Sequence, residues 1–471
     1  MNKLNEILQK KFGHANFRDG QQEIVEQILD GKDVVAILPT GMGKSLLYQL
    51  PAYLMEGTVI IVSPLLSLMQ DQVEQLKILG EKRVIAINSF LSFQEREMAI
   101  RHLADFKFIF TSPEMLQNEQ FNRALRNLSI AYVVADEAHC ISQWGFDFRP
   151  DYLRISNWLD SLKDVNILAL TATATKEVVE DIKQTLMMNK PFEYIHSLDR
   201  PTIAYEMVQV ENHQDKMNWI LGRVTSTEGP GIIYTQSRKK TEVYAAMLRE
   251  QGISVAYYHA KMEQSDRILI QQQFQQGQLD WICATNAFGM GIHKDNIRQI
   301  IHDHIPTSVA GYMQEVGRAA RDGNQAIASL LYTSSDVDHT FYVAMQDFPE
   351  EQDIHIAYQP EYSEVEQAET TTRILAYWKE RLNEQETIQL FKQIKQKKWQ
   401  DIQNFYKVIQ DDTCLRQQLL HYFDQTLLEK PYHCCSKCKI DVSNILRKRS
   451  EEKNDQDEMN WKNRLNILLP S

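Results

Sequence analysis

Short apolar runs alternate with helical patterns along most of the chain, and this alternation constrains the fold more than any other feature. The first stretch begins at Val34 and ends near Thr175. Its apolar runs are VVAILP, TVIIVSP, VIAINS, FKFIFTSP, IAYVVADE and NILALTAT. Segments such as SLMQDQVEQLKIL lie between them and have the 3.6-residue period of helices. Strands that alternate with helices form a parallel sheet with right-handed crossovers, so this stretch predicts an α/β domain.

The same alternation restarts after Pro230, with the apolar runs GIIYTQS, SVAYYHA, LDWICATN, QIIHDHIP and AIASLLYT. We expect a second α/β domain of similar size, joined to the first around residues 198–211. The alternative is a single decorated domain, but the number of strands exceeds what one such sheet usually carries. A cleft between two such domains is a favoured place for a ligand.

The pattern changes again beyond Met345. Acidic residues and glutamines dominate residues 346–370, and helical periodicity returns in ILAYWKERL, LFKQIKQKKWQDIQNFYKVI and CLRQQLLHYFDQTL. We therefore predict four segments: an α/β domain at 1–203, a second at 204–345, a small helical domain at 346–443 and a tail at 444–471. The tail contains WKNRLNILL, which is either a frayed end or an amphipathic docking helix.

The composition limits the class of protein. Of the 471 residues 43% are hydrophobic, which is enough for packed cores. No apolar run approaches the roughly 18 residues that span a bilayer, and the first residues lack an apolar signal-peptide region, so we expect a cytoplasmic protein. The net charge of −12 is unfavourable for a nucleic-acid binder, which normally has basic surface. It does not exclude a local basic groove.

Residues 38–45, LPTGMGKS, follow an apolar run and precede a helical pattern, which is the context of a phosphate-binding loop. Gly41 and Gly43 let backbone N–H groups face an anion. Lys44 can reach the β- and γ-phosphates of a nucleotide, and the Ser45 hydroxyl can ligate Mg²⁺. Leu38 replaces the first glycine of the strict pattern, so a tight turn is the alternative. We predict a nucleotide site formed by Thr40, Gly41, Met42, Gly43, Lys44 and Ser45.

The apolar run IAYVVADE ends in two carboxylates, Asp136 and Glu137. The carboxyl ends of buried parallel strands are where open α/β sheets bind ligands. Asp136 can hold Mg²⁺ directly or through water, and Glu137 can polarise the attacking water. Because successive strand residues point to opposite faces, we expect the two carboxylates to diverge. An Asp-Glu pair is usually solvated surface, and the buried strand argues against that alternative.

Two arginines in the second stretch are candidates for the same chemistry. Arg318 and Arg321 lie three residues apart in QEVGRAAR, on a helical pattern, so we expect them on one helix face. Across an interdomain cleft they could stabilise the charge that develops on a γ-phosphate, as arginine fingers do. Such spacing alone is typical of a solvated face.

An aromatic cluster follows the two carboxylates. Trp144, Phe146, Phe148 and Tyr152 lie close together, with Arg149 among them. Aromatic side chains and an arginine suit the stacking of bases. We hypothesise that residues 130–152 join a phosphate-hydrolysing site to a nucleic-acid surface.

Over roughly residues 5–438 these motifs resemble the superfamily 2 helicases, and specifically the RecQ family. PTGMGKS resembles motif I, SPLLSLMQDQV motif Ia, DEAHCISQWG motif II, TATAT motif III, CATNAFGMGIHKDNIR motif V and QEVGRAARDG motif VI. FGHANFRDGQ resembles motif 0, which implies that Arg18 and Gln21 read adenine, with His14 where many members stack a tyrosine. QWGFDFRPDY resembles the aromatic-rich loop that couples DNA binding to ATP hydrolysis. Departures are GRAAR for the usual GRAGR, Phe146 for a common histidine and Lys261 for a usual glycine.

The resemblance implies two tandem RecA-like domains and an ATP-dependent DNA helicase that moves 3′→5′ in repair and recombination. The implied cofactors are ATP and Mg²⁺, the latter held by Ser45 and Asp136. The implied partners are single-stranded and forked DNA, with single-strand-binding protein or other repair proteins as further candidates, and the implied state is a monomer. The implied catalytic residues are Lys44, Asp136, Glu137, Gln314, Arg318 and Arg321. The implied DNA contacts are Ser63, Pro64, Thr111, Trp144, Phe148 and Arg149.

Four of the six cysteines lie within 25 residues: Cys414, Cys434, Cys435 and Cys438. They resemble the RecQ zinc module, with Cys434 and Cys435 adjacent as in a short form of the family. Four thiolates suit tetrahedral Zn²⁺ in a closed structural site, and His433 is an alternative ligand to Cys434. The isolated Cys140 and Cys283 are expected to be buried and reduced. About thirty residues follow the cluster, too few for the winged-helix and HRDC domains of longer members.

Two other functions fit the same motifs. Superfamily 2 cores also serve RNA helicases and translocases that do not unwind, although the aromatic loop and the cysteines favour DNA. The chain could also be an ATP-switched DNA-binding or strand-annealing protein. Steady turnover stimulated by DNA would distinguish a motor from a switch.

Overall fold

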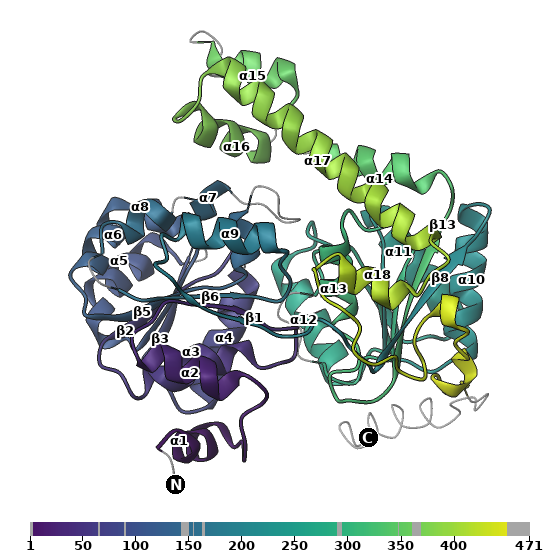
Figure 1. The fold of residues 1–471 in the computed structure, drawn as a ribbon, viewed down its shortest axis with the longest axis horizontal. Helices are drawn as coiled ribbons and strands as arrows, with labels where there is room; N and C mark the ends of the chain where they lie inside the picture. The colour runs from purple at the N-terminus through teal and green to yellow at the C-terminus, as the bar shows by residue number, and fades with distance from the viewer. Residues whose placement is uncertain are drawn as a thin grey trace, which may run out of the picture.

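The structure is a computed structural model. The residues that it describes are 3–64, 66–88, 91–142, 150–153, 155–162, 165–289, 294–346, 348–359 and 369–449. Two α/β bodies lie beside each other, and a helical arm extends from the second over the first (Figure 1).

The first body is built on a seven-stranded sheet with the order β3-β4-β2-β5-β6-β1-β7, and the pairings of neighbouring strands are parallel. Strand residues alternate between two apolar layers, because successive side chains point to opposite faces of the sheet. Val34 packs with helices α1–α4 on one face, and Val35 packs with α5, α6 and α9 on the other. The strands are β1 (Val34–Ile37), β2 (Thr58–Val62), β3 (Val84–Ile87), β4 (Phe108–Thr111), β5 (Ile130–Ala135), β6 (Ile167–Thr171) and β7 (Phe192–Ile195).

The helices of this body occupy the connections between strands, as right-handed crossovers require, except the first two, which precede β1. They are α1 (Lys3–Phe12), α2 (Gln21–Leu29), α3 (Lys44–Ala52), α4 (Leu66–Ile78), α5 (Phe93–Arg101), α6 (Glu119–Arg126), α7 (Pro150–Leu153), α8 (Ile155–Leu159) and α9 (Lys176–Thr185).

The second body has a six-stranded sheet with the order β10-β11-β9-β12-β13-β8 and parallel pairings. Its strands are β8 (Ile203–Gln209), β9 (Gly231–Tyr234), β10 (Val255–Tyr258), β11 (Trp281–Ala284), β12 (Gln299–His302) and β13 (Ala326–Tyr332). Its helices are α10 (His213–Ser226), α11 (Arg238–Glu250), α12 (Gln264–Gln275) and α13 (Val309–Val316). The two separate sheets confirm the prediction of tandem α/β domains and exclude the single decorated domain.

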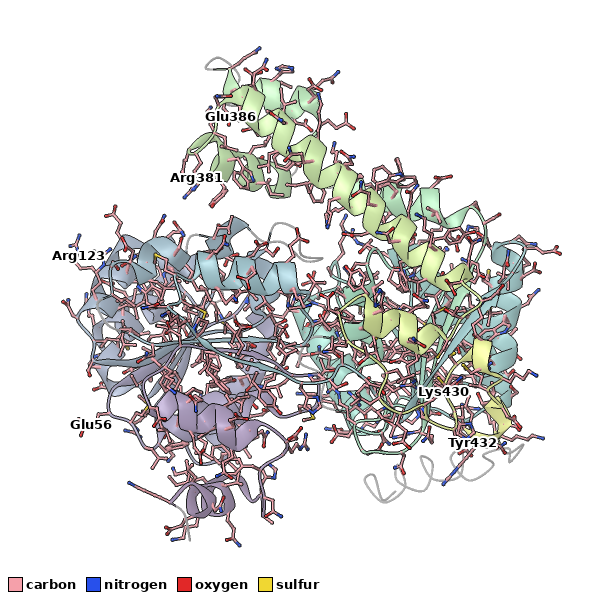
Figure 2. All side chains as sticks on the ribbon, in the orientation of Figure 1. Glu56, Arg123, Arg381, Glu386, Lys430 and Tyr432 are labelled. Carbon is pink, nitrogen blue, oxygen red and sulfur yellow. The ribbon has the colours of Figure 1, made fainter. Side chains whose placement is uncertain are left out.

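The last part of the described chain is helical. It contains α14 (Asp336–Met345), α15 (Glu351–Tyr358), α16 (Glu369–Lys379), α17 (Glu384–Gln410) and α18 (Leu415–His421). Asn383 and Glu386 form a capping box that starts α17, the longest of these helices. Arg381 and Glu386 mark the outer end of the arm, whereas Tyr432 projects from the opposite side of the second body (Figure 2). α18 and the cysteine loop pack on the second sheet through Leu419 and Cys434.

Two strands differ from the sequence prediction. β7 was not expected, and β8 lies inside residues 198–211, which we expected to be only a joint; it is the edge strand of the second sheet and pairs with β13. Packing also continues beyond residue 443, because Leu446 is buried against Ala204 and Ile327. The expected helix WKNRLNILL and most of the expected tail lie outside the described residues.

None of the helices in the described ranges has the length and apolarity of a membrane-spanning segment.

Candidate ATP site and zinc module

The topology of the first sheet gathers the predicted phosphate chemistry at one edge. The parallel strands β1, β5 and β6 are neighbours in the order β5-β6-β1, so their carboxyl ends lie side by side. The phosphate loop follows β1, Asp136 and Glu137 follow β5, and the TATAT segment follows β6. Ligands bind at this edge in open α/β sheets.

The phosphate loop has the backbone geometry that an anion site requires. Gly43 caps α3 with φ 76° and no side-chain hydrogen bond to the first helical turn, which leaves N–H groups of that turn available to an anion. A Cβ at Gly43 would lie 2.8 Å from Nε2 of Gln21, so a side chain there would displace that amide. The Lys44 ammonium is buried, has no hydrogen-bond partner among the described residues and lies 3.8 Å from the Glu137 carboxylate.

The two carboxylates have different environments. Asp136 is buried, and burial together with the neighbouring Glu137 raises its pKa to about 7. Burial alone would raise the pKa of Glu137, but the positive charges of Lys44, His139 and Arg318 outweigh it, so that pKa is lowered. Glu137 is therefore the carboxylate that stays ionised at neutral pH. The expectation that the pair diverges as strand neighbours is wrong, because β5 ends at Ala135 and Glu137 has a left-handed φ of 50°.

His139 connects the carboxylates to the segment after β6. Its Nδ1 lies 3.4 Å from Oε2 of Glu137 and 2.9 Å from Oγ1 of Thr171. The Thr171 hydroxyl in turn donates to the carbonyl of Thr173. The buried His139 therefore lies between Glu137 and the first residue of the TATAT segment.

The second body places its arginines against this edge. Gln314 and Arg318 are buried, and the Arg318 guanidinium donates to the carbonyl of Gly289. The Cγ of Arg321 would lie 3.2 Å from a Cβ at Gly41, so this side chain covers the phosphate loop. The expectation that both arginines share a helix face is wrong, because α13 ends at Val316. They lie in the turn that follows it, where Ala320 has a left-handed φ of 55°.

Arg18 and Gln21, the expected adenine-reading residues, contact the phosphate loop itself. The Arg18 guanidinium donates to the carbonyl of Gly41, and Nε2 of Gln21 donates to the carbonyl of Met42 at 2.8 Å. Oε1 of Gln21 accepts the N–H of Arg18 at 2.9 Å. The two residues therefore brace the loop, and adenine recognition stays a prediction.

The expected DNA contacts fall into two groups. Ser63, Pro64 and Thr111 are described and buried, and the Thr111 hydroxyl donates to the carbonyl of Ile87 at 3.3 Å. A DNA contact there would involve backbone groups at the strand ends, and it stays a prediction. Trp144, Phe146, Phe148 and Arg149 lie outside the described residues.

Tyr152, the last aromatic of the cluster, has a structural position rather than an exposed one. It is fully buried, and its hydroxyl donates to the carbonyls of Asp136 and Val62. The expectation that this ring is available for base stacking is therefore wrong. It ties the end of the aromatic segment to the backbone of the ATP site.

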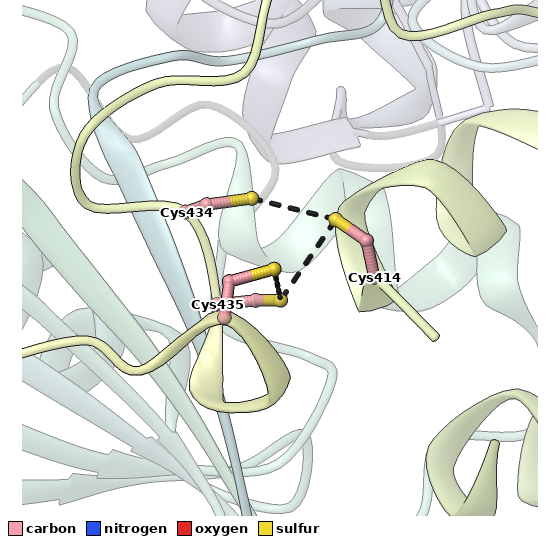
Figure 3. Close-up of side chains that lie close together, drawn as sticks. Cys414, Cys434 and Cys435 are labelled. Atoms are coloured by element: carbon pink, nitrogen blue, oxygen red, sulfur yellow. Dashed lines mark hydrogen bonds between the residues drawn. The ribbon is translucent and has the colours of Figure 1, made fainter. Parts of the chain in front are cut away.

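The four clustered cysteines form a group of the size that a tetrahedral metal needs. Their sulfur atoms all lie within 4.8 Å of one another, and His433 is not part of the group. The Sγ–Sγ distances are 3.5 Å for Cys414–Cys434, 4.0 Å for Cys414–Cys435 and 3.4 Å for Cys435–Cys438. A tetrahedron with Zn–S bonds of about 2.3 Å has edges of roughly 3.8 Å. The side chains of Cys414, Cys434 and Cys435 point toward one another (Figure 3).

This cysteine group is attached to the edge of the second sheet. The N–H of Tyr205 in β8 donates to the carbonyl of Cys434 at 3.2 Å, and the N–H of Met207 donates to the Ser436 hydroxyl at 3.2 Å. Cys414 directly precedes α18. We call Cys414, α18 and residues 434–438 the zinc module.

Family models match three consecutive parts of the chain. DEAD/DEAH box helicase matches residues 18–182, helicase conserved C-terminal domain matches residues 215–323, and RecQ zinc-binding matches residues 374–441. The chain is also 41% identical to the probable ATP-dependent DNA helicase RecS of Bacillus subtilis, over 96% of this chain and 95% of that protein. The chain belongs to the RecQ family of ATP-dependent DNA helicases.

Longer RecQ proteins are similar over a smaller share of their length. The ATP-dependent DNA helicase RecQ of Pasteurella multocida is 40% identical over 70% of this chain and 52% of that protein. The chain thus spans about half the length of this relative.

Solved structures support only the fold of two parallel-sheet domains, because their identities are low. The helicase Lhr of Mycobacterium smegmatis, bound to ssDNA and AMP-PNP, is 21% identical with a TM-score of 0.59, over 73% of this chain and 49% of that one. Dbp5 of S. cerevisiae, bound to RNA and ADP BeF3, is 16% identical with a TM-score of 0.60, over 83% of this chain and 97% of that one.

Two arginines outside the sequence motifs make contacts around the segment that joins the two bodies of this RecQ protein. Arg200 lies in the segment between the two sheets and donates to the carbonyls of Thr40 in the first body and Gly317 in the second, and the fully buried Arg416 contacts the same segment from α18. A single arginine outside a motif carries no periodic signal. The sequence offers one sign of Arg416, which follows the predicted zinc ligand Cys414 by two residues.

Proposed function

We propose that this chain is an ATP-dependent DNA helicase that translocates 3′→5′ on single-stranded DNA and unwinds duplex DNA in repair and recombination. The observation that carries the proposal is the meeting of three groups between two parallel sheets. These are the phosphate loop with Lys44, the ionised Glu137, and the turn that holds Arg318 and Arg321. A phosphate loop, a base and arginines from a second domain are the parts that phosphoryl transfer requires.

The geometry supports a sequence of steps. ATP binds with its phosphates at the N-terminus of α3, where Lys44 exchanges Glu137 for the β- and γ-phosphates. Glu137 then orients and deprotonates the attacking water, and Arg318 and Arg321 stabilise the charge that develops on the γ-phosphate. Ser45 and Asp136 offer the oxygen ligands that Mg²⁺ prefers, and the ion would neutralise phosphate charge. Loss of the γ-phosphate removes a contact between the two bodies, so each turnover opens and closes the cleft.

DNA is the proposed substrate because of the relatives rather than the fold. The two solved neighbours above are bound to ssDNA and to RNA, so the core does not discriminate. The relatives with helicase activity in their names act on DNA, and the zinc-binding match is specific to RecQ. We propose single-stranded and forked DNA as partners of a cytoplasmic monomer, with single-strand-binding protein or other repair proteins as further partners.

The test compares hydrolysis and unwinding on defined nucleic acids. ATPase turnover is measured with single-stranded DNA, duplex DNA and RNA, and unwinding is measured on forks with a 3′ or a 5′ single-stranded tail. We expect stimulation by single-stranded DNA and unwinding of the 3′-tailed fork, with both activities absent in Lys44→Ala. Stimulation by RNA alone would support an RNA helicase, and turnover that no nucleic acid changes would refute the proposal.

The proposed zinc ligands have a separate test. Metal analysis of the purified chain should give about one zinc per chain, held by Cys414, Cys434, Cys435 and Cys438. Cys435→Ser should lose that zinc, whereas Cys283→Ser, which removes an isolated buried thiol, should keep it. Retention of zinc by Cys435→Ser would contradict the ligand set.

A further inference from the structure

Arg200 joins the two halves of the ATP site with one side chain. Its Nη1 donates to the carbonyls of Thr40, at 3.0 Å, and Gly317, at 3.2 Å. Its Nη2 donates to the carbonyls of Ala319, at 3.0 Å, and Ala320, at 3.2 Å. Thr40 belongs to the phosphate loop, and the other three residues form the turn that carries Arg318 and Arg321. The planar guanidinium therefore fixes the distance between the loop and the arginine turn.

A second arginine holds the chain from which Arg200 projects. Arg416 is 1% exposed, and its Nη1 donates to Oδ1 of Asp199 at 2.5 Å and to the carbonyl of Arg200 at 2.9 Å. Its Nη2 donates to the carbonyls of Ile203 and Cys434. Arg416 lies in the first turn of α18, two residues after Cys414. It thus connects two cysteines of the zinc module to the backbone of Arg200.

A third contact holds the same segment to the same part of the fold. The side chain of Gln425, which follows α18, accepts the N–H of Leu198 at 2.8 Å and donates to the carbonyl of His196 at 3.3 Å. Residues 196–203 are therefore held on the zinc-module side by Arg416 and Gln425. On the side of the ATP site, the side chain of Arg200 donates to both the phosphate loop and the arginine turn. No other side chain of residues 196–203 does so in the described structure.

The chemistry of these contacts indicates positioning rather than catalysis. The four acceptors of the Arg200 guanidinium are backbone carbonyls, and none of them is a reacting group. Arg200 is half-buried, and its four neutral acceptors give it no charge partner, so these bonds contribute geometry more than electrostatic attraction. The geometry that it fixes is the placement of the arginine turn relative to the phosphates, on which the rate of phosphoryl transfer depends.

We propose that Arg200 and Arg416 form a positioning relay that couples the zinc module to ATP hydrolysis. Arg416 secures the segment between the sheets, and Arg200 sets the arginine turn against the phosphate loop. The relay rests on the proposed ATPase and assigns to the zinc module a role in the ATP site of the same chain. It acts on the rate of hydrolysis and leaves nucleotide binding, which depends on the loop itself, largely unchanged.

The first test is Arg200→Gln, compared with Arg200→Lys and with Arg223→Gln. Arg223 is a half-buried arginine of the second body that pairs with Glu206 outside the cleft, and its variant is the matched control. We expect Arg200→Gln to lower kcat about 10- to 100-fold, as a misplacement of about 1 Å does, with the Kd of a fluorescent ATP analogue changed less than about threefold. Arg200→Lys should lie between wild type and Arg200→Gln, and Arg223→Gln should match wild type.

The second test asks whether the two arginines act together. Arg416→Gln should lower kcat in the same direction with zinc content unchanged, and the double variant should be no slower than the slower single variant, because both changes release the same turn. If Arg416→Gln does not fold, Asp199→Asn removes the carboxylate partner and leaves the arginine in place.

The outcomes separate the relay from the proposed function. A wild-type chain without DNA-stimulated turnover would refute the helicase, whatever the variants do. A stimulated wild type with unchanged kcat in Arg200→Gln, or with independent and multiplicative losses in the double variant, would refute the relay alone. A rise in Kd that accounts for the whole loss of activity would also refute it.

Discussion

At the scale of single residues, Lys44 of the phosphate loop and Glu137 after β5 form a buried ion pair. The pair lies 3.8 Å apart, and the charges around Glu137 lower its pKa. In the proposed mechanism Glu137 is a base that is already ionised when its partner Lys44 meets a phosphate. Glu137 itself binds ATP less directly, because the phosphates meet the backbone of the loop and Lys44.

We therefore expect Glu137→Gln to separate binding from hydrolysis. Loss of the base should lower kcat about 10²- to 10⁴-fold, whereas the affinity for ATP should stay near that of wild type because Gln cannot take a proton but fills the same space. Turnover and the binding of a fluorescent ATP analogue measure the two effects. Glu180→Gln, at an exposed ion pair with Lys183, is the control and should change neither. Wild-type turnover in Glu137→Gln would remove Glu137 from the mechanism.

Gly43 gives a second prediction at this scale. Its φ of 76° strains any side chain, and an added Cβ would also lie 2.8 Å from the Gln21 amide that braces the loop. Gly80 has a φ of 88° but open space around its Cβ position. Gly80→Ala therefore measures the cost of backbone strain without a steric contact. Gly43→Ala and Gly80→Ala should both lose about 1 kcal/mol of stability, but only Gly43→Ala should lower ATP affinity, by at least about tenfold. Equal affinities by calorimetry would show that the contact with Gln21 is irrelevant.

At the scale of elements, α17 carries a half-buried acidic residue that makes stability depend on pH. Burial raises the pKa of Asp401 to about 6; Lys397 and Lys398 oppose the shift, and Glu177 adds to it. Between pH 4 and 6 the native state holds more protons than the unfolded state, so stability falls as pH rises through this window. Above pH 6 the folded chain keeps a charged, poorly solvated carboxylate.

Asp401→Asn should consequently be more stable than wild type at pH 8, and its advantage should shrink as the pH falls toward 5. Thermal unfolding of wild type and Asp401→Asn at several pH values measures the difference in their stability. The titration of other groups is the same in both chains and cancels in this difference. Asp411→Asn is the control, because a hydrogen bond from Thr413 lowers the pKa of Asp411, and that variant should gain no stability at any pH. An advantage of Asp401→Asn that does not vary with pH would contradict the assignment.

Elements with a clear apolar pattern were predictable, and the exceptions have physical causes. The fully buried strands β1, β2 and β4 are continuous apolar runs, which no solvated segment imitates. β7 was missed because its burial alternates at the sheet edge, where half of its residues face solvent. β8 was hidden in an expected joint, because its second half is only partly buried.

The residues of the candidate site also divide into those that a local sequence pattern predicts and those that it does not. The phosphate loop, the two carboxylates and the cysteines could be predicted because each is a local pattern with its own chemistry. The turn that holds Arg318 and Arg321 was assigned to a helix, since a period of three residues does not reveal that α13 ends at Val316. The contact of Arg416 with Arg200 joins residues that are 216 positions apart, and no local pattern encodes it.

At the scale of the whole molecule, several polar contacts hold the two bodies and the arm together. The Thr40 hydroxyl donates to the carbonyl of Gly317 at 2.8 Å, and Arg200 spans the same gap. On the far side of the cleft Lys397 of α17 pairs with Glu177 of α9 at 3.4 Å. Lys176 of α9 also pairs with Asp424, which follows α18, at 3.8 Å. Hydrogen bonds and ion pairs are easier to exchange than a large apolar interface, which suits the opening and closing of the proposed ATP cycle.

The net charge of −12 predicts how DNA binding depends on salt. A chain with this charge repels DNA at long range, so its affinity must come from a limited number of local phosphate contacts. Binding to a labelled single strand should then weaken with salt, with a slope of log K against log[salt] of about −0.7 per phosphate contact, or roughly −3 to −6 for four to eight contacts. Fluorescence anisotropy between 50 and 300 mM salt (roughly the range in which such slopes are measured) gives the slope, and from it the number of phosphate contacts. Lys44→Ala should show the same slope because Lys44 serves the nucleotide, and a slope near zero would mean that stacking rather than phosphate contacts holds the strand.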